Sequence, residues 1–189
     1  MVCLSFVYVA VLLAGILLGF SGMDFPVYIQ EVLAALLFII GIDLMMSENK
    51  AEKIKNSWKS SMRLVVATVT GSIAGGLIAG ALTGMSFKTA MAIGAGMGWY
   101  SLTGPYLAAK VGTFAGAVGF TSNFFREMLT IVFYPKMPDK EAGISAGGAT
   151  TMDSTLPIIA SFGKDLSLTA FMHGFVISIL VPLLLFILG

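Results

Sequence analysis

The sequence predicts an all-α polytopic membrane protein with about five transmembrane helices and two broken, re-entrant helical hairpins related as inverted repeats. The membrane assignment rests on composition, because 57% of the 189 residues are hydrophobic and only 11% are charged. A soluble domain carries roughly 25% charged residues, so most of the outer surface of this chain must face lipid. A stretch containing Gly, Thr and Pro occurs twice in the second half of the chain and predicts the two hairpins.

The same composition argues against several classes of function. The net charge of +1 gives no reason to expect a nucleic-acid partner. The single Cys3 excludes an intrachain disulfide and a thiolate metal cage, and the single His173 argues against a histidine metal site. No nucleophile–base pair and no phosphate-binding loop stands out, so we expect neither an enzyme nor a bound cofactor.

Seven apolar segments follow one another along the chain, each near the roughly 20 residues that a membrane span requires. The first three form an amino-terminal three-helix unit, residues 1–85. The first segment is interpreted as a retained helix and not as a signal peptide, because no basic residue precedes it. These three segments are Val2–Phe20, about 28–46, and 64–87.

The last four segments form two similar units, residues 86–134 and 135–189. Each unit starts with a broken segment, 89–109 with Pro105 or 143–163 with Pro157, and ends with a long apolar helix, 111–134 or 166–188. Together the three units make a single membrane transport domain, residues 1–189.

The two broken segments resemble each other, since 94–105 aligns with 146–157 and brings Thr103 opposite Thr155 and Pro105 opposite Pro157. A hairpin followed by one span crosses the membrane once, so the two units would be inverted. Transporters often build their binding sites from broken helices in two such halves. The hairpins would then enter from opposite faces, and their tips would meet near the midplane.

The alternative is that these glycines only let helices pack closely. That is what we expect in the third segment, which contains Gly71, Gly75, Gly80 and Gly84. The two interpretations are compatible.

The orientation follows from the basic loop before the third segment, which we place in the cytoplasm. It contains Lys50, Lys53, Lys55, Lys59 and, just beyond, Arg63. With two re-entrant hairpins, the amino terminus of a cytoplasmic (inner) membrane protein would lie inside and the carboxyl terminus outside. The short loop at 135–141 agrees, although its two lysines are accompanied by two acids.

Ionisable side chains within spans cost about 2.5–3.5 kcal/mol each and usually mark a transport pathway. Glu127 is the strongest candidate, with Asp153 beside the second break, and the excess of interior acids over Arg126 predicts a carrier of a cationic or zwitterionic solute. Trp99, Tyr100 and Tyr106 could offer aromatic faces to an ammonium group. The candidate substrate- or ion-binding residues are Glu127, Asp153, Asn123, Arg126, Ser101, Thr103, Thr151, Ser154, Thr155, Asp43 and His173.

Each charged candidate also has a purely structural interpretation. Asp153 could cap a helix, Asp43 could be an interfacial residue, and His173 could satisfy a local hydrogen bond where a proton relay is the functional alternative. Arg126 and Glu127 could neutralise other charges, since adjacent residues point about 100° apart on a helix.

Four motifs in the same order resemble the LysO family of lysine exporters, from about Ala34 to the carboxyl terminus. They are Gly-Trp-Tyr-Ser-Leu-Thr-Gly-Pro at 98–105, Asn-Phe-Phe-Arg-Glu at 123–127, Gly-Gly-Ala-Thr-Thr-Met-Asp-Ser-Thr-Leu-Pro at 147–157, and His-Gly-Phe at 173–175. The resemblance implies export of L-lysine and toxic lysine analogues from the cytoplasm, with Glu127 and Asp153 as site residues. We expect alternating access coupled to H⁺ or Na⁺.

Longer members of that family carry about three further helices before the matching region. We therefore expect the chain to work with a separately encoded amino-terminal subunit or as a homodimer. Two alternatives remain from the sequence: a sodium-coupled carrier of another organic solute, and a non-coupled pore or membrane-assembly subunit.

Overall fold

The structure is a computed structural model that describes residues 2–20, 29–46 and 49–189, and every regular element in these residues is helical. The elements are α1 (Val2–Phe20), α2 (Ile29–Met46), α3 (Lys50–Thr83), α4 (Phe87–Gly94), α5 (Tyr100–Lys110), α6 (Thr113–Phe133), η1 (Tyr134–Lys136), α7 (Lys140–Gly147), η2 (Gly148–Met152), α8 (Leu156–Ala160) and α9 (Lys164–Leu188). The all-helical prediction is confirmed for these residues.

Two helices of the described chain, α3 and α9, are long and apolar enough to cross a membrane. The first two expected segments correspond to α1 and α2, which lie against α6 and α9 respectively. The expected segments 111–134 and 166–188 correspond to α6 and α9 within two residues at each end.

The prediction of a basic loop before the third segment is wrong. Residues 50–63 are helical, and α3 runs for 34 residues, or about 51 Å at 1.5 Å per residue. Between Lys50 and Gly71 the sequence has no Pro or Gly, so the helix continues through the polar residues until Gly84 ends it with φ 72°. Near the basic end of α3, Lys53 forms an exposed ion pair with Asp165 of α9 at 3.9 Å.

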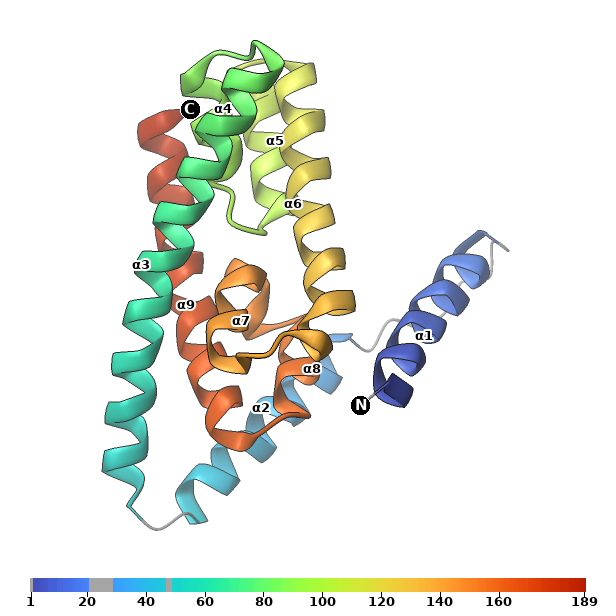
Figure 1. Ribbon diagram of the computed structural model, residues 1–189, viewed down its shortest axis with the longest axis vertical. Coiled ribbons are helices and arrows are strands. Elements are labelled where there is room, and N and C mark those ends of the chain that lie inside the picture. Colours follow the sequence, from blue (N-terminus) through green and yellow to red (C-terminus); the bar gives the residue numbers. More distant parts are fainter. Residues whose placement is uncertain (1, 21–28, 47–48) are drawn as a thin grey trace.

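The first broken segment reverses its direction. In Figure 1, α4 runs from the far end of α3 toward the middle of the molecule, and α5 runs back alongside it. Between them, residues 95–99 form an irregular loop in which Met97 and Gly98 have φ values of 41° and 94°. The prediction that Pro105 interrupts the helix is wrong, because Pro105 lies inside α5. It follows the loop closely, so it removes a single hydrogen bond near the start of the helix without ending it.

The second broken segment approaches the same region from the other end. Figure 1 shows α7 running toward the middle and the chain returning through α8 to the start of α9. Here Pro157 lies in the first turn of α8, where its missing N–H costs nothing. The Ala149 amide donates a 2.8 Å hydrogen bond to the Met97 carbonyl, so the loops at 95–99 and 148–155 touch backbone to backbone.

This contact requires glycine on both sides. A Cβ on Gly148, whose φ is 65°, would overlap the Met97 carbonyl oxygen. A Cβ on Gly98 would lie 2.8 Å from the Gly147 carbonyl oxygen. The glycines of the two broken segments therefore permit a close approach of two loops as well as a break.

Small residues also pack helices together, but mostly not where we expected. Of the four glycines named in the third segment, Gly80 meets Ala90 of α4, whereas among the residues that the structure describes Gly71, Gly75 and Gly84 have no neighbour within 4 Å of an added Cβ. The packing prediction is therefore wrong for these three. Close contact between α3 and α4 instead occurs at Gly76, which meets the backbone of Ala90, and at Gly94, which meets the backbone of Ser72.

The core consists of two apolar clusters, one at each end of the region where the loops meet. The larger joins α3, α4, α5, α6 and α9 around Leu107 and Ile177, and the smaller joins α7, α8 and α9 around Tyr134 and Leu156. Met97 and Ala149 of the two loops belong to the larger cluster, and polar contacts also hold these loops and form the surroundings of the site.

Candidate functional site

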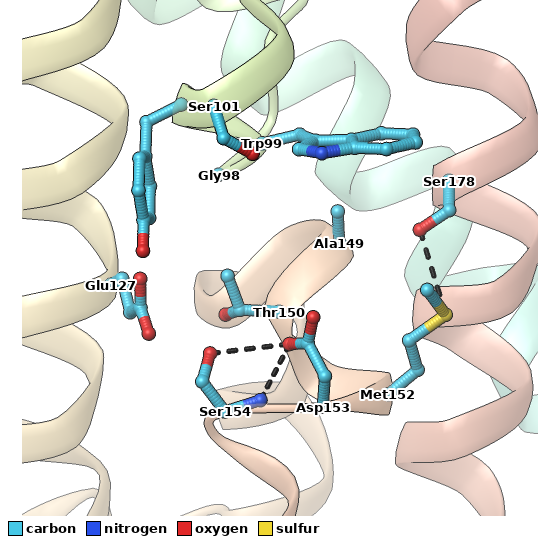
Figure 2. A pocket seen from close by; sticks show the side chains of 11 residues that line it. Gly98, Trp99, Ser101, Glu127, Ala149, Thr150, Met152, Asp153, Ser154 and Ser178 are labelled. Carbon is cyan, nitrogen blue, oxygen red and sulfur yellow. Dashed lines mark hydrogen bonds between the residues drawn. The ribbon is translucent and has the colours of Figure 1, made fainter. Parts of the chain in front are cut away.

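A cavity of about 140 Å³ lies where the two loops meet. Binding pockets for drug-sized ligands occupy roughly 300–1,000 Å³, so this cavity suits a small solute. Five parts of the chain line it: the first loop, the start of α5, the middle of α6, the second loop and α9 (Figure 2). The lining residues are Gly98, Trp99, Tyr100, Ser101, Glu127, Ala149, Thr150, Met152, Asp153, Ser154 and Ser178.

Glu127 projects from α6 into one side of the cavity and is 4% exposed. Its Oε2 atom is buried and has no hydrogen-bond partner among the residues that the structure describes. The side chains of Tyr100 and Ser154 approach the same carboxyl group. A buried carboxylate with a free oxygen needs a proton or a cation to offset the loss of its hydration.

Asp153 occupies the other side of the cavity, between η2 and α8 (Figure 2). Its Oδ1 atom accepts hydrogen bonds from the Ser154 amide at 2.5 Å and the Ser154 hydroxyl at 3.2 Å. The interpretation of Asp153 as a helix N-cap is wrong, because the cap position of α8 belongs to Thr155. Asp153 therefore holds its own loop and presents a carboxylate to the cavity.

Asn123 lies four residues before Glu127 on α6 and holds the first loop. Its side-chain amide donates to the Ile93 carbonyl at 3.1 Å and the Gly119 carbonyl at 2.9 Å, while its oxygen accepts from the Gly98 amide at 2.7 Å. The Ile93 carbonyl lies in the last turn of α4, where it also accepts the Gly96 amide at 3.2 Å. Asn123 is thus a structural support behind the cavity wall.

Arg126 holds the second loop in a similar way. Its guanidinium donates to the carbonyls of Ala146 at 2.7 Å and Ser145 at 2.9 Å, and to the Ser72 hydroxyl at 2.6 Å. Both carbonyls lie in the last turn of α7, where a positive charge is favoured by the helix dipole. Arg126 lines two side pockets but not the cavity with the two acids. As predicted, it does not pair with Glu127.

His173 is fully buried on α9 and is used structurally. Its Nδ1 atom lies 2.9 Å from the Thr151 hydroxyl and its Nε2 atom 2.8 Å from the Thr68 hydroxyl. The ring therefore links the second loop to α3. It is not among the residues that line the cavity, so the geometry favours the local hydrogen-bond interpretation over the proton relay.

A family model described as "Lysine exporter LysO" matches residues 9–188.

The chain belongs to the LysO family.

Two curated LysO-type relatives agree with this assignment. Lysine exporter LysO of Escherichia coli K12 is 34% identical over 182 residues, which are 93% of this chain and 60% of the relative. A proposed lysine exporter of Haemophilus influenzae is 31% identical over 159 residues, which are 82% of this chain and 80% of the relative. The resemblance inferred from the motifs is confirmed, and the family is one of membrane transporters. No solved structure matches the chain.

The hydroxyl residues expected at the LysO-type site divide into two groups. Ser101 and Ser154 line the cavity. Thr103, Thr151 and Thr155 are buried, and the hydroxyls of Thr103 and Thr151 donate to the backbone at Trp99 and Gly148. We therefore expect these three threonines to shape the loops and not to contact a solute in this conformation.

Some lining residues were missed and some candidates lie elsewhere. Thr150, Met152 and Ser178 line the cavity but were not predicted. Ser178 could have been found, because its hydroxyl is a polar group within the apolar helix α9. Tyr106, expected near an ammonium group, packs instead beside Gly189 at the carboxyl terminus. Asp43 lies in α2, but its side chain is outside the described part of the structure.

Proposed function

We propose that this chain forms the substrate site of a secondary transporter that exports L-lysine, and toxic lysine analogues, from the cytoplasm by alternating access. Family membership supports a lysine substrate. The observation that carries the proposal is the cavity in which the carboxylates of Glu127 and Asp153 face a small space between two helix-break loops. Lysine carries two ammonium groups and one carboxylate, and two carboxylates can offset its positive charges.

In this proposal, one ammonium group lies against Glu127 and the other against Asp153. The substrate carboxylate lies near the start of α5, where Tyr100 and Ser101 line the cavity. Helix amino termini carry a partial positive charge, and broken helices in transporters direct this charge toward anionic groups of the substrate. After lysine leaves, H⁺ or Na⁺ takes its place at the free oxygen of Glu127 and moves inward.

We further propose that α4–α5 and α7–α8 are re-entrant hairpins of two inverted units. Their support is the path of the chain, which turns back in the middle of the molecule from opposite ends (Figure 1). The basic end of α3 would face the cytoplasm and the carboxyl terminus the outside. Alternating access would then require the two loops to part on one side at a time, breaking the contact between Met97 and Ala149.

The chain spans 60% of the length of its Escherichia coli relative. We therefore retain the proposal that export requires a separately encoded amino-terminal subunit or a second copy of the chain. Size-exclusion chromatography with light scattering on the purified chain measures directly whether two copies associate. A monomer that exports lysine by itself would rule out both the separate subunit and the homodimer.

The test is lysine export from dipeptide-fed cells that lack their own exporter. Cells would produce the chain alone, the chain with a candidate partner, and the variants Glu127→Gln and Asp153→Asn. Glu52→Gln is the matched control, since it makes the same chemical change on an exposed part of α3. We expect at least tenfold slower export for the two cavity variants and normal export for the control.

Normal export by Glu127→Gln would refute the proposed binding of an ammonium group at Glu127. Flux that does not saturate with lysine would favour the alternative of a non-coupled pore. Sodium-dependent uptake of another solute, without lysine export, would favour the organic-solute carrier.

A further inference from the structure

We propose that Trp99 is a substrate-binding residue, whose indole face and the Asp153 carboxylate hold one ammonium group between them. This inference rests on the proposed function and specifies how the same cavity recognises a substrate with two ammonium groups. It assigns the selectivity for the second positive charge to an aromatic side chain as well as to the acids.

The position of Trp99 is determined by its backbone. It precedes α5 in a non-helical conformation, with φ −87° and ψ 69°. Its carbonyl accepts hydrogen bonds from the Thr103 amide at 2.9 Å and the Thr103 hydroxyl at 2.7 Å. The preceding residue, Gly98, donates its amide to Asn123. Because the backbone is held on both sides, the indole needs no large rearrangement to meet a ligand.

The indole forms one wall of the cavity. Figure 2 shows it lying across one end of the cavity, with Asp153 on the side that faces the second loop and Ser178 beside it. Part of the side chain packs against the larger core cluster, and Trp99 as a whole is only partly buried. An ammonium group in the cavity would therefore have the ring on one side and a carboxylate on the other.

The other aromatic residue at the cavity is already engaged. The ring of Tyr100 makes edge contacts with Phe120 at 5.2 Å and Phe124 at 5.5 Å between centroids, while its hydroxyl approaches Glu127. Within the described residues, no ring pair involves Trp99. The arrangement assigns Tyr100 to hydrogen bonding with Glu127 and leaves the Trp99 face for a cation.

The chemistry favours this division. Tryptophan has the strongest cation–π attraction of the aromatic side chains, and the attraction increases when the cation loses its water. Asp153 uses Oδ1 for Ser154, so its second oxygen remains for the ammonium group. A substrate such as norleucine, which lacks the ε-ammonium group, would leave the ring and this oxygen without a partner. The cavity would therefore discriminate against neutral amino acids of the same length.

The test uses fluorinated tryptophans in the full-length protein. The chain has two tryptophans, so a Trp58→Phe background leaves Trp99 as the sole site of incorporation. Trp58 is 49% exposed on α3, which makes this background a suitable control. Protein containing tryptophan or its mono-, di- or trifluoro analogues would be purified, and L-lysine binding measured by titration calorimetry. Export would be measured in cells producing the unfluorinated background protein.

Fluorine withdraws electron density from the ring face without changing its size greatly, so we expect the lysine Kd to rise step by step with each fluorine. Trp99→Leu should raise Kd about 2- to 30-fold, the range that corresponds to 0.5–2 kcal/mol. Trp99→Phe should fall between, and both variants should still bind with normal stoichiometry.

Lysine binding and export with a Kd that does not change across the fluorine series would overturn the role of Trp99 and leave the proposed function standing. Absence of lysine export and binding in the unfluorinated background, both alone and together with the candidate partner, would overturn both. The series avoids the risk that a Trp99 variant fails to fold, because the indole remains in place throughout.

Discussion

Replacing Gly148 with alanine tests whether the contact between the two loops supports the cavity. Gly148 has φ 65° and ψ −131°, a backbone conformation that residues with a side chain rarely adopt. The strain of such a conformation is about 1–3 kcal/mol. The added Cβ would also overlap the Met97 carbonyl oxygen, which accepts the hydrogen bond from Ala149. Loss of that bond adds about 1 kcal/mol. We therefore expect a total destabilisation of about 2–4 kcal/mol.

Substitutions at two further glycines separate the cost of backbone strain from the cost of losing the contact between the loops. Gly84 has φ 72° but open space around an added Cβ, so Gly84→Ala should show the backbone strain alone. Gly71 is helical and also has open space, so Gly71→Ala should be neutral or stabilising by up to about 1 kcal/mol. Neither substitution affects the contact between the loops.

The measurement is the Tm of the purified full chain in detergent, followed by intrinsic fluorescence, together with lysine export. For a chain of this size about 1 kcal/mol corresponds to roughly 2–4 °C, so Gly148→Ala should lower Tm by about 5–15 °C and reduce export. Gly84→Ala should lower Tm by less and leave export unchanged. If the two variants have the same Tm and both export normally, the contact between the loops does not support the site.

Three other substitutions test the surrounding supports. Arg126→Lys keeps the charge but replaces the planar guanidinium by a compact ammonium group that cannot reach all three acceptors. We therefore expect the free energy of unfolding to fall by about 2–3 kcal/mol, seen as a lower Tm, and export to slow. An unchanged Tm would show that the hydrogen bonds to α7 are dispensable. His173→Ala should lower the free energy of unfolding by about 2–4 kcal/mol, because it removes the two buried hydrogen bonds to the Thr68 and Thr151 hydroxyls, and His173→Gln should restore part of that loss. A proton relay instead predicts that both variants abolish export while Tm is retained. Asp165→Asn should change the stability by less than about 1 kcal/mol, because its ion pair with Lys53 is exposed; a large drop in Tm would contradict this.

Much of the fold could be predicted because the signals are local. Long, largely apolar runs predicted α6 and α9 closely, since helix length and hydropathy depend on neighbouring residues. The same reasoning failed at α3, because charged residues at its start were interpreted as a loop although they favour helix. It also failed at Pro105, where the break came from the irregular backbone at Met97 and Gly98 and not from the proline.

The candidate site was predictable only in part. The cost of burying charge singled out Glu127 and Asp153 from the sequence, and both line the cavity. The same criterion also selected Arg126 and His173, which line no part of that cavity and are engaged by backbone and threonine partners. Burial alone cannot distinguish a group that awaits a ligand from one whose hydrogen bonds are satisfied within the protein.

The sequence by itself determined that this is a helical membrane protein of the LysO type with two broken segments and two acids beside them. Only the tertiary structure decided which neighbours share a cavity. Arg126 and Glu127 are adjacent in the chain, yet they point to different sides of α6, so one holds the end of α7 and the other faces the cavity. That outcome depends on backbone groups from distant segments, such as Met97 and Ala149, meeting in space, and no local pattern of side chains encodes such a meeting.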